Sequence, residues 1–158
     1  MRASVEAPDN EPIIVMTRVF DASVELVWKA HTDPKQLAQW WGPRGFEVIE
    51  CRLAAAPGEP WRIAQKSPDG QVFTFKGECL EMTPGRRIVQ TFGMEGMFED
   101  KVIVETLEME DIGDGRTKIT TVQRFESFED RAGMLSTGME TGANDSWDRL
   151  DELLEKAA

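Results

Sequence analysis

Few residues in this sequence have the types and spacing that acid–base or nucleophilic catalysis requires. His31 is the only histidine, and it shares one face of a predicted helix with Val24, Val27 and Trp28, which favours a packing role. Its place at the end of that helix favours a partial positive charge, so acid–base chemistry stays open. The chain has no G-x-S-x-G motif, and the neighbours of His31 suggest no catalytic triad. We therefore predict no catalytic residue and do not predict an enzyme.

The abundant carboxylates give no sign of a metal site. Glu108 and Glu110 alternate with Leu107 and Met109 along a predicted strand, so the two acidic side chains should face solvent. No spacing of His, Cys, Asp or Glu resembles a set of metal ligands. We expect neither a metal nor a cofactor.

Aromatic and methionine side chains are stronger candidates for a binding site. Phe73 and Phe75 are two residues apart, so they share one face of a strand. The chain has eight methionines, and methionine adapts to irregular apolar ligands. Core packing alone would also explain such a set. The candidate ligand-binding residues of this kind are Trp61, Phe73, Phe75, Phe92, Met97, Phe98, Met139 and Trp147.

Two adjacent tryptophans, Trp40 and Trp41, end a predicted helix just before the chain break at Gly42 and Pro43. They cannot both face the same side of a helix end. We expect one to pack in the core and the other, Trp41, to reach the mouth of a cavity, although both could be core residues. An indole suits either role, because it buries a large area and keeps one N–H to donate.

Composition limits the possible partners. The 158 residues fit one domain, with residues 1–11 expected as a flexible tail and residues 12–158 as the folded unit. The formal charge of −11 argues against nucleic acid or an anionic membrane as a partner. Cys51 and Cys79 are too few for a zinc motif or a disulfide framework, so we expect two reduced thiols in a cytoplasmic protein. Strand edges would make either a monomer or a homodimer reasonable.

Strand and turn signals alternate along most of the chain. Tight turns such as Asp69-Gly70 predict hairpins and therefore an antiparallel sheet. Helices are expected at 23–32, with Ser23 as N-cap, and at 34–40, where Pro34 is suited to the first helical position. The expected strands are 13–20, 46–53, 61–66, 71–81, 86–92, 101–110 and 116–125, with a loop at 93–100.

A long helix is expected after Ser127. Its apolar residues recur every three or four positions, from Leu135 through Met139 to Leu154, and form one continuous stripe. Gly138 and Gly142 lie on or beside this stripe, and a close neighbour or a ligand would explain them. The stripe must be buried against the sheet, and a sheet curved around one helix leaves a gap between the two.

Several motifs resemble a known family. They are RVFDAS at 18–23, the segment from Glu25 to Phe46 with its TDP and WWGP motifs, the PDG hairpin, TVQRF at 121–125, and the C-terminal motif from Gly138 to Leu154. Together they resemble proteins related to the C-terminal domain of the heat-shock protein 90 ATPase activator, a stress-related family of the START-like (SRPBCC) superfamily. The resemblance covers about Ile13 to Lys156.

The resemblance implies an α+β helix-grip fold. In that fold a curved seven-stranded antiparallel sheet surrounds a long C-terminal helix and an apolar cavity, with two short helices after the first strand. The chain has Ala143 where family members usually have tryptophan. The smaller side chain should enlarge the cavity, so Ala143 joins the candidate ligand-binding residues.

Three functions follow from these observations. The first is non-catalytic binding of a small apolar or amphipathic molecule, with Gln90, Thr121 and Gln123 as possible polar contacts. The second is a co-chaperone-type interaction with a chaperone through the outer surface, as the family resemblance implies. The third is a cyclase-like enzyme that uses the same cavity, for which a buried ionisable group with a shifted pKa would be a sign.

Overall fold

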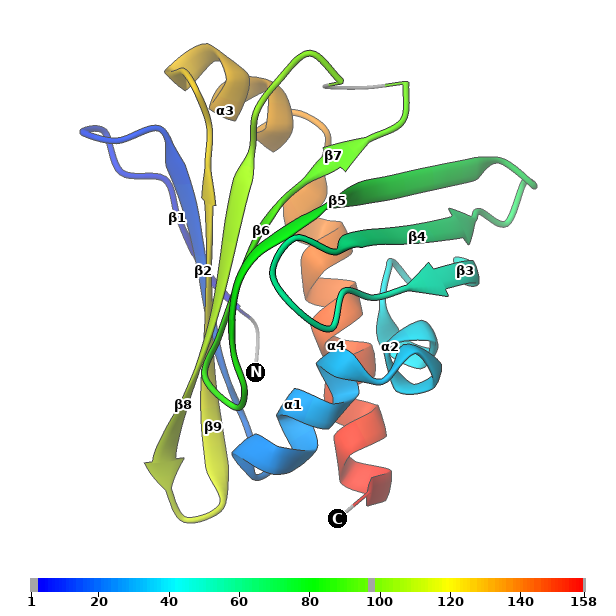
Figure 1. Ribbon diagram of the computed structural model, residues 1–158, viewed down its shortest axis with the longest axis vertical. Helices are drawn as coiled ribbons and strands as arrows, with labels where there is room; N and C mark the ends of the chain where they lie inside the picture. Colours follow the sequence, from blue (N-terminus) through cyan, green and yellow to red (C-terminus); the bar gives the residue numbers. More distant parts are fainter. Residues whose placement is uncertain (1–2, 97–98, 158) are drawn as a thin grey trace.

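Short turns connect most of the strands, and every pair of neighbouring strands is antiparallel. The computed structural model describes residues 3–96 and 99–157. Its single sheet has the strand order β1-β2-β9-β8-β6-β5-β4-β3, with β7 paired to β5 (Figure 1). The strands are β1 (Ser4–Glu6), β2 (Ile13–Phe20), β3 (Glu47–Arg52), β4 (Pro60–Lys66), β5 (Val72–Thr83), β6 (Arg87–Thr91), β7 (Gly93–Met94), β8 (Val104–Gly113) and β9 (Arg116–Arg124).

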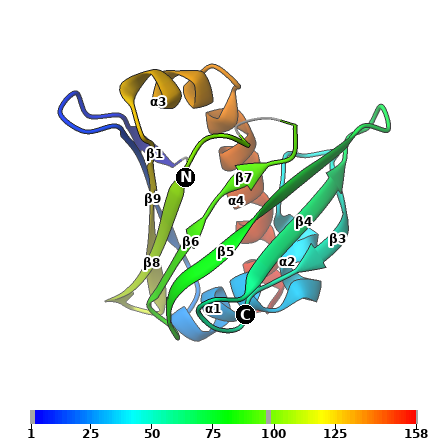
Figure 2. The ribbon, with the colours of Figure 1, turned by 45° about the horizontal axis from the view of Figure 1, so that its top comes forward.

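The long strand β5 connects two arms of the sheet. Its first half pairs with β4, and its second half, from Cys79 onward, pairs with β6 after a register shift. The sheet bends strongly at β5, so that β3 and β4 run at a large angle to β2, β8 and β9 (Figure 1). Figure 2 shows the two arms on either side of the C-terminal helix. The curved antiparallel sheet and the α+β class agree with the expected helix-grip fold.

The helices begin where the sequence predicts. In α1 (Val24–Thr32), the backbone N–H of Leu26 donates to the Ser23 hydroxyl at 3.4 Å. In α2 (Pro34–Trp40), the N–H of Lys35 donates to the Asp33 carboxylate at 2.9 Å. Both bonds satisfy N–H groups that a helix leaves unpaired at its first turn.

The expected long helix is divided in two. The structure has α3 (Phe128–Leu135) and α4 (Met139–Ala157), separated at Gly138, whose φ is +80°. A left-handed residue ends a helix, and glycine adopts that conformation without steric cost. The prediction of one continuous apolar stripe is therefore wrong at its start: Leu135 is 36% exposed, whereas Trp147, Leu150 and Leu154 on α4 are buried.

Two short strands were not predicted, so the sheet has nine strands in the described part of the chain instead of the expected seven. One is β1, which pairs with residues 15–17 of β2. The residue before β1 is tied to α4, because the N–H of Ala3 donates to Asn144 Oδ1 at 2.9 Å. The expectation of a flexible tail over residues 1–11 is thus corrected for Ser4–Glu6. The other is β7, inside the expected loop at 93–100.

A fully buried part of the core lies where α1 and α4 meet the sheet. Phe20, Val27, Ile119 and Leu150 are fully buried there. No helix among the described residues is long and apolar enough to cross a membrane.

Candidate functional site

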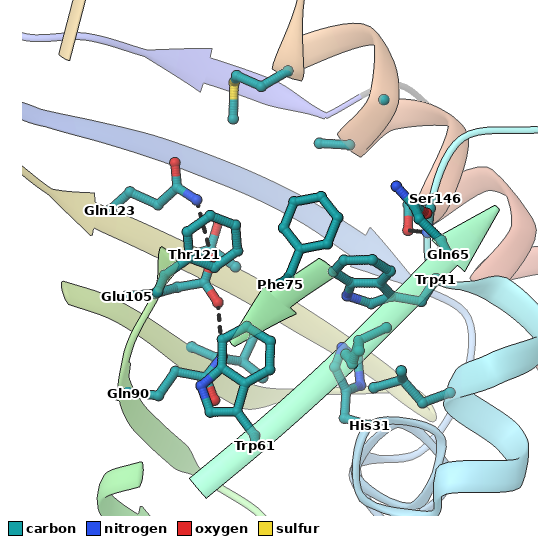
Figure 3. A pocket seen from close by; sticks show the side chains of 18 of the residues that line it. His31, Trp41, Trp61, Gln65, Phe75, Gln90, Glu105, Thr121, Gln123 and Ser146 are labelled. Atoms are coloured by element: carbon teal, nitrogen blue, oxygen red, sulfur yellow. Dashed lines mark hydrogen bonds between the residues drawn. The ribbon is translucent and has the colours of Figure 1, made fainter. Parts of the chain in front are cut away.

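A cavity of about 700 Å³ lies between the concave face of the sheet and α2, α3 and α4. Its wall is mostly aromatic and aliphatic, with a few polar side chains (Figure 3). A pocket of this size and character can enclose a small organic molecule.

Most of the predicted ligand-binding residues lie on this wall. Trp41 meets Phe75 edge-to-face with ring centroids 4.9 Å apart, and Phe92 lies between Phe75 and Trp61 at 5.7 and 5.9 Å. Met97 and Phe98 lie outside the described residues. The predicted residues that line the cavity are Trp41, Trp61, Phe73, Phe75, Phe92, Met139, Ala143 and Trp147.

The two adjacent tryptophans divide their roles as expected. Trp40 is buried, and its indole N–H donates to the carbonyl of Ala30 at 2.9 Å, which joins α2 to α1. Trp41 follows the helix, and its ring packs edge-to-face against Phe75 on the cavity wall (Figure 3). Trp40 also contributes to the wall.

Polar groups of α4 hold the turn after Trp41. The Ser146 hydroxyl accepts from the N–H of Gly42 at 3.0 Å and donates to the carbonyl of Trp40 at 3.2 Å. The Arg149 guanidinium donates to the carbonyls of Gln39 at 2.9 Å and Gly42 at 3.0 Å. These bonds satisfy the carbonyls at the end of α2 and fix the mouth of the cavity.

The absence of a side chain at Gly142 allows a close contact between α4 and the turn after Trp41. A Cβ atom on Gly142 would lie 3.4 Å from Pro43 Cγ, so the glycine allows the turn to approach the helix. This is one of the two reasons expected for the helical glycines, a close neighbour. Gly138 has neither expected reason: its positive φ, in the connection between α3 and α4, explains the glycine.

One row of side chains crosses three neighbouring strands inside the cavity. Gln90 on β6, Glu105 on β8 and Gln123 on β9 are register partners. Both amide Nε2 groups donate to the Glu105 carboxyl, each at 3.1 Å (Figure 3). We call Gln90, Glu105 and Gln123 the carboxyl–amide row.

Burial raises the pKa of Glu105, while the amide hydrogen bonds from Gln123 and Gln90 oppose that rise. The cause is desolvation, which penalises the charged carboxylate in an apolar surrounding. Glu105 is therefore an ionisable group whose proton affinity is set by the cavity. Such groups often mark functional sites.

His31 also lines the cavity. Burial lowers its pKa to about 4, although a hydrogen bond to the Val27 carbonyl opposes the shift. The expected partial positive charge at this helix end is thus wrong, because desolvation outweighs the helix dipole. Nδ1 lies 2.8 Å from Val27 O, and a carbonyl only accepts, so Nδ1 carries the proton and Nε2 is an acceptor.

Two amide oxygens on the wall are buried without a hydrogen-bond donor among the described residues: Gln65 Oε1 and Gln123 Oε1. In Figure 3, Gln65 lies beside Ser146 and Trp41, on the other side of the view from Gln123. Gly42 makes room for Gln65, since a Cβ there would lie within 2.2 Å of Gln65 Oε1. Buried acceptors of this kind are costly unless something donates to them.

The remaining chemical groups add little. Among the described residues, no three His, Cys, Asp or Glu side chains are arranged to hold a metal ion. Cys51 and Cys79 are both free thiols, and burial raises the pKa of each. Glu108 and Glu110 are exposed on the outer face, as predicted.

Sequence reasoning missed Glu105 and Gln65. The signal was present in both cases as two-residue alternation. Glu105 has the same parity as Leu107 and Met109, which face inward, and Gln65 has the parity of Trp61 and Ile63. Gln90, Thr121 and Gln123, which were considered as polar contacts, all line the cavity.

Comparisons with known proteins agree with this geometry. The model of the family described as Activator of Hsp90 ATPase homolog 1-like protein matches residues 21–155. The chain belongs to this family. The match confirms the resemblance read from the WWGP and C-terminal motifs. No curated protein matches the chain.

Solved structures confirm the fold. A crystal structure of a Rhodobacter sphaeroides protein has 22% identity and a TM-score of 0.88, covering 98% of this chain and 99% of that one. An Arthrobacter aurescens protein solved by NMR has 25% identity and a TM-score of 0.86, covering 97% and 91%. DynU16, described with the dynemicin biosynthetic locus, has 21% identity and a TM-score of 0.68, and the chain spans 49% of its length.

Proposed function

We propose that this protein binds a small apolar or amphipathic molecule in the cavity between the sheet and α4, without transforming it. The observation that carries the proposal is the cavity itself, about 700 Å³ lined by aromatic rings and a few inward polar groups. Apolar area removed from water would supply the affinity, and the polar groups would orient the ligand.

Native mass spectrometry of the freshly purified protein, followed by organic extraction, tests this proposal. We expect a reproducible extra mass that is released on denaturation. In parallel, N-phenyl-1-naphthylamine, an uncharged fluorescent probe, should show saturable binding to one site, with energy transfer from Trp41, Trp61 and Trp147 on the wall. A clean protein mass together with no saturable probe binding would overturn the proposal.

A second candidate is a cyclase-like enzyme that uses the same cavity. Glu105 favours it, because its raised pKa suits a carboxyl that gives or takes a proton at a bound substrate. Incubating the extracted molecule with the protein and with Glu105→Gln separates the two functions. Conversion by the wild type but not by the variant would establish the enzyme, and an unchanged molecule would support simple binding.

A third candidate comes from the family description, which names activation of the Hsp90 ATPase. That activity would use outer surfaces of the domain. Adding the protein to a chaperone ATPase assay tests it, and Ala143→Trp is a useful variant there. Filling the cavity should leave a surface-based stimulation unchanged.

A further inference from the structure

Several hydrogen-bond donors of the cavity wall are committed to the protein itself. The indole N–H groups of Trp40 and Trp61 donate to the carbonyls of Ala30 and Thr91 at 2.9 and 3.0 Å. The hydroxyl of Ser146 donates to the carbonyl of Trp40. In the carboxyl–amide row, both amide groups donate to Glu105. The indole N–H groups of Trp41 and Trp147, the Gln65 Nε2 group and the Thr121 hydroxyl also belong to the wall, and no such bond is found for them in the described part of the chain.

The acceptors of the wall are, in contrast, open. Gln65 is 5% exposed, and its Oε1 has no donor partner among the described residues. The same holds for Gln123 Oε1, next to Glu105. His31 adds Nε2, because its other nitrogen is bonded to Val27. Buried acceptors are stabilised by a donor, and a bound molecule can supply it.

The charged groups of the wall also determine which ligands fit, because they disfavour an anion. No lysine or arginine is among the described residues that line the cavity, whereas Glu105 is. If Glu105 is ionised it repels a bound anion, and if it is protonated the anion still has no counter-charge. An anion moved from water into such a site loses its hydration without compensation.

We propose that the cavity selects uncharged apolar molecules that carry hydroxyl or aromatic-amine hydrogen-bond donors, and that it excludes anionic amphiphiles such as fatty-acid carboxylates. This rests on the proposed function and adds the chemical class of its ligand. One donor group of the ligand lies at the carboxyl–amide row, where Gln123 Oε1 and Glu105 accept it. A second donor group on the same ligand, at a distance from the first, can reach Gln65 Oε1.

Three probes that share one ring system test the selection: 1-hydroxypyrene, 1-methoxypyrene and pyrene-1-carboxylate. Each is titrated into the protein at neutral pH, with energy transfer from tryptophan as the signal. We expect 1-hydroxypyrene to bind about tenfold more tightly than 1-methoxypyrene, which cannot donate. Pyrene-1-carboxylate should bind about a hundredfold more weakly than 1-hydroxypyrene, because it brings an uncompensated charge.

Two matched variants locate the effect. Glu105→Gln removes the carboxyl inside the cavity, whereas Glu108→Gln removes one on the same strand that faces solvent beside Arg87. Both replace one carboxyl group with an amide of similar size. The quantity compared is the ratio of the affinities for 1-hydroxypyrene and pyrene-1-carboxylate. We expect Glu105→Gln to reduce this ratio by about tenfold, and Glu108→Gln to leave it unchanged.

The outcomes distinguish the two proposals. If none of the three probes binds, the proposed function itself fails. If all three bind equally, or the carboxylate binds most tightly, the cavity binds ligands but the selection proposed here is wrong. The order of affinities of the three probes for the wild-type protein distinguishes these outcomes even if Glu105→Gln does not fold.

Discussion

At the scale of single residues, Trp147 belongs both to the core and to the cavity wall. It is 7% exposed, and its ring meets Phe20 edge-to-face at 5.9 Å. We expect Trp147→Ala to lower the free energy of unfolding by about 3–5 kcal/mol, as for large aromatic truncations in cores. A denaturant titration measures this, with the surface substitution Leu135→Ala as control. A loss below about 1 kcal/mol would mean that the indole lines open space and packs against little.

Ala143 is the residue at which the cavity can be closed by a single change. It lines the cavity from α4, next to Gly142 and one helical turn from Trp147. We expect Ala143→Trp to reduce the affinity for N-phenyl-1-naphthylamine by more than about tenfold, because an indole occupies the space of the probe. The circular dichroism spectrum should be unchanged. Unaltered affinity in a folded variant would place the binding site elsewhere.

The residues of the site were predictable to the extent that strand parity is visible in the sequence. Phe73 and Phe75 were placed on one face, and both line the cavity. Glu105 was missed because a glutamate in a strand is usually a solvent-facing residue, although its parity with Leu107 indicated the inner face. The bonds that hold it come from Gln90 and Gln123, which become its neighbours only through strand pairing.

At the scale of elements, Gly77 allows β5 to pass from one arm of the sheet to the other. A Cβ atom there would lie 1.9 Å from the carbonyl oxygen of Thr91 and 2.6 Å from Trp61 Nε1. Gly77→Ala must therefore move backbone and break the Trp61–Thr91 hydrogen bond. We expect a loss of about 2–4 kcal/mol in the free energy of unfolding, typical of overpacking with a lost buried bond.

Gly93 is the matched control for this prediction. It lies on β7 opposite Lys76, the neighbour of Gly77, and a Cβ atom added to Gly93 would have Lys76 O as its nearest neighbour, at 3.8 Å. Gly93→Ala should change stability by less than about 1 kcal/mol in the same titration. Equal losses for the two alanine variants would show that strand propensity, and not the close approach, explains the glycine at 77.

Arg149 connects two elements that lie far apart in the sequence. Its guanidinium donates to carbonyls at the end of α2, including Gln39 and Gly42. We expect Arg149→Met, which keeps much of the aliphatic stem, to lower the free energy of unfolding by about 1–3 kcal/mol, the range for hydrogen bonds from a charged group. Arg44→Met, which removes only an exposed pair with Glu152, should have little effect on thermal unfolding. A similar loss of stability in Arg149→Met and Arg44→Met would contradict the role of Arg149 in connecting α4 to the end of α2.

The elements were more predictable than their ends. Hairpin glycines and alternating apolar residues determine most strands locally, so seven were expected in the right order. The short strand β1 was not, since three residues, SVE, carry too little pattern. It is held by long-range contacts, the pairing with β2 and the bond from Ala3 to Asn144. The break at Gly138 was also missed, because periodicity continues across a single left-handed residue.

At the scale of the whole molecule, the cavity follows from how few elements cover a large curved sheet. One long helix, α4, lies against the concave face, and α1 and α2 contact it. Side chains are therefore fully buried where α1, α4 and the sheet meet, and other parts of the concave surface form the cavity wall. Two ionisable groups on that wall that titrate in the acidic range, Glu105 and His31, must then influence the stability of the fold as well as binding.

The dependence of stability on pH follows from these two groups, with opposite signs. The pKa of His31 is lowered from 6.5 to about 4, so between these values the unfolded chain binds a proton that the folded chain does not, and stability is lost as the pH falls through this window. Glu105 has a raised pKa, so its folded state binds the proton first, and its contribution is lost as the pH rises above the unfolded value of 4.5.

Single variants separate the two contributions. His31→Asn keeps a donor for the Val27 carbonyl and removes the titration. From about pH 7.5 to about pH 5, the wild type should lose about 2 kcal/mol more unfolding free energy than this variant, as the shift predicts. Over the same range, Glu105→Gln should lose more unfolding free energy than the wild type, because it lacks a group that favours the folded state at lower pH. Denaturant titrations across this range measure both. Parallel curves for the wild type and His31→Asn would mean that the imidazole is hydrated in the folded protein, and that the cavity admits water as far as α1.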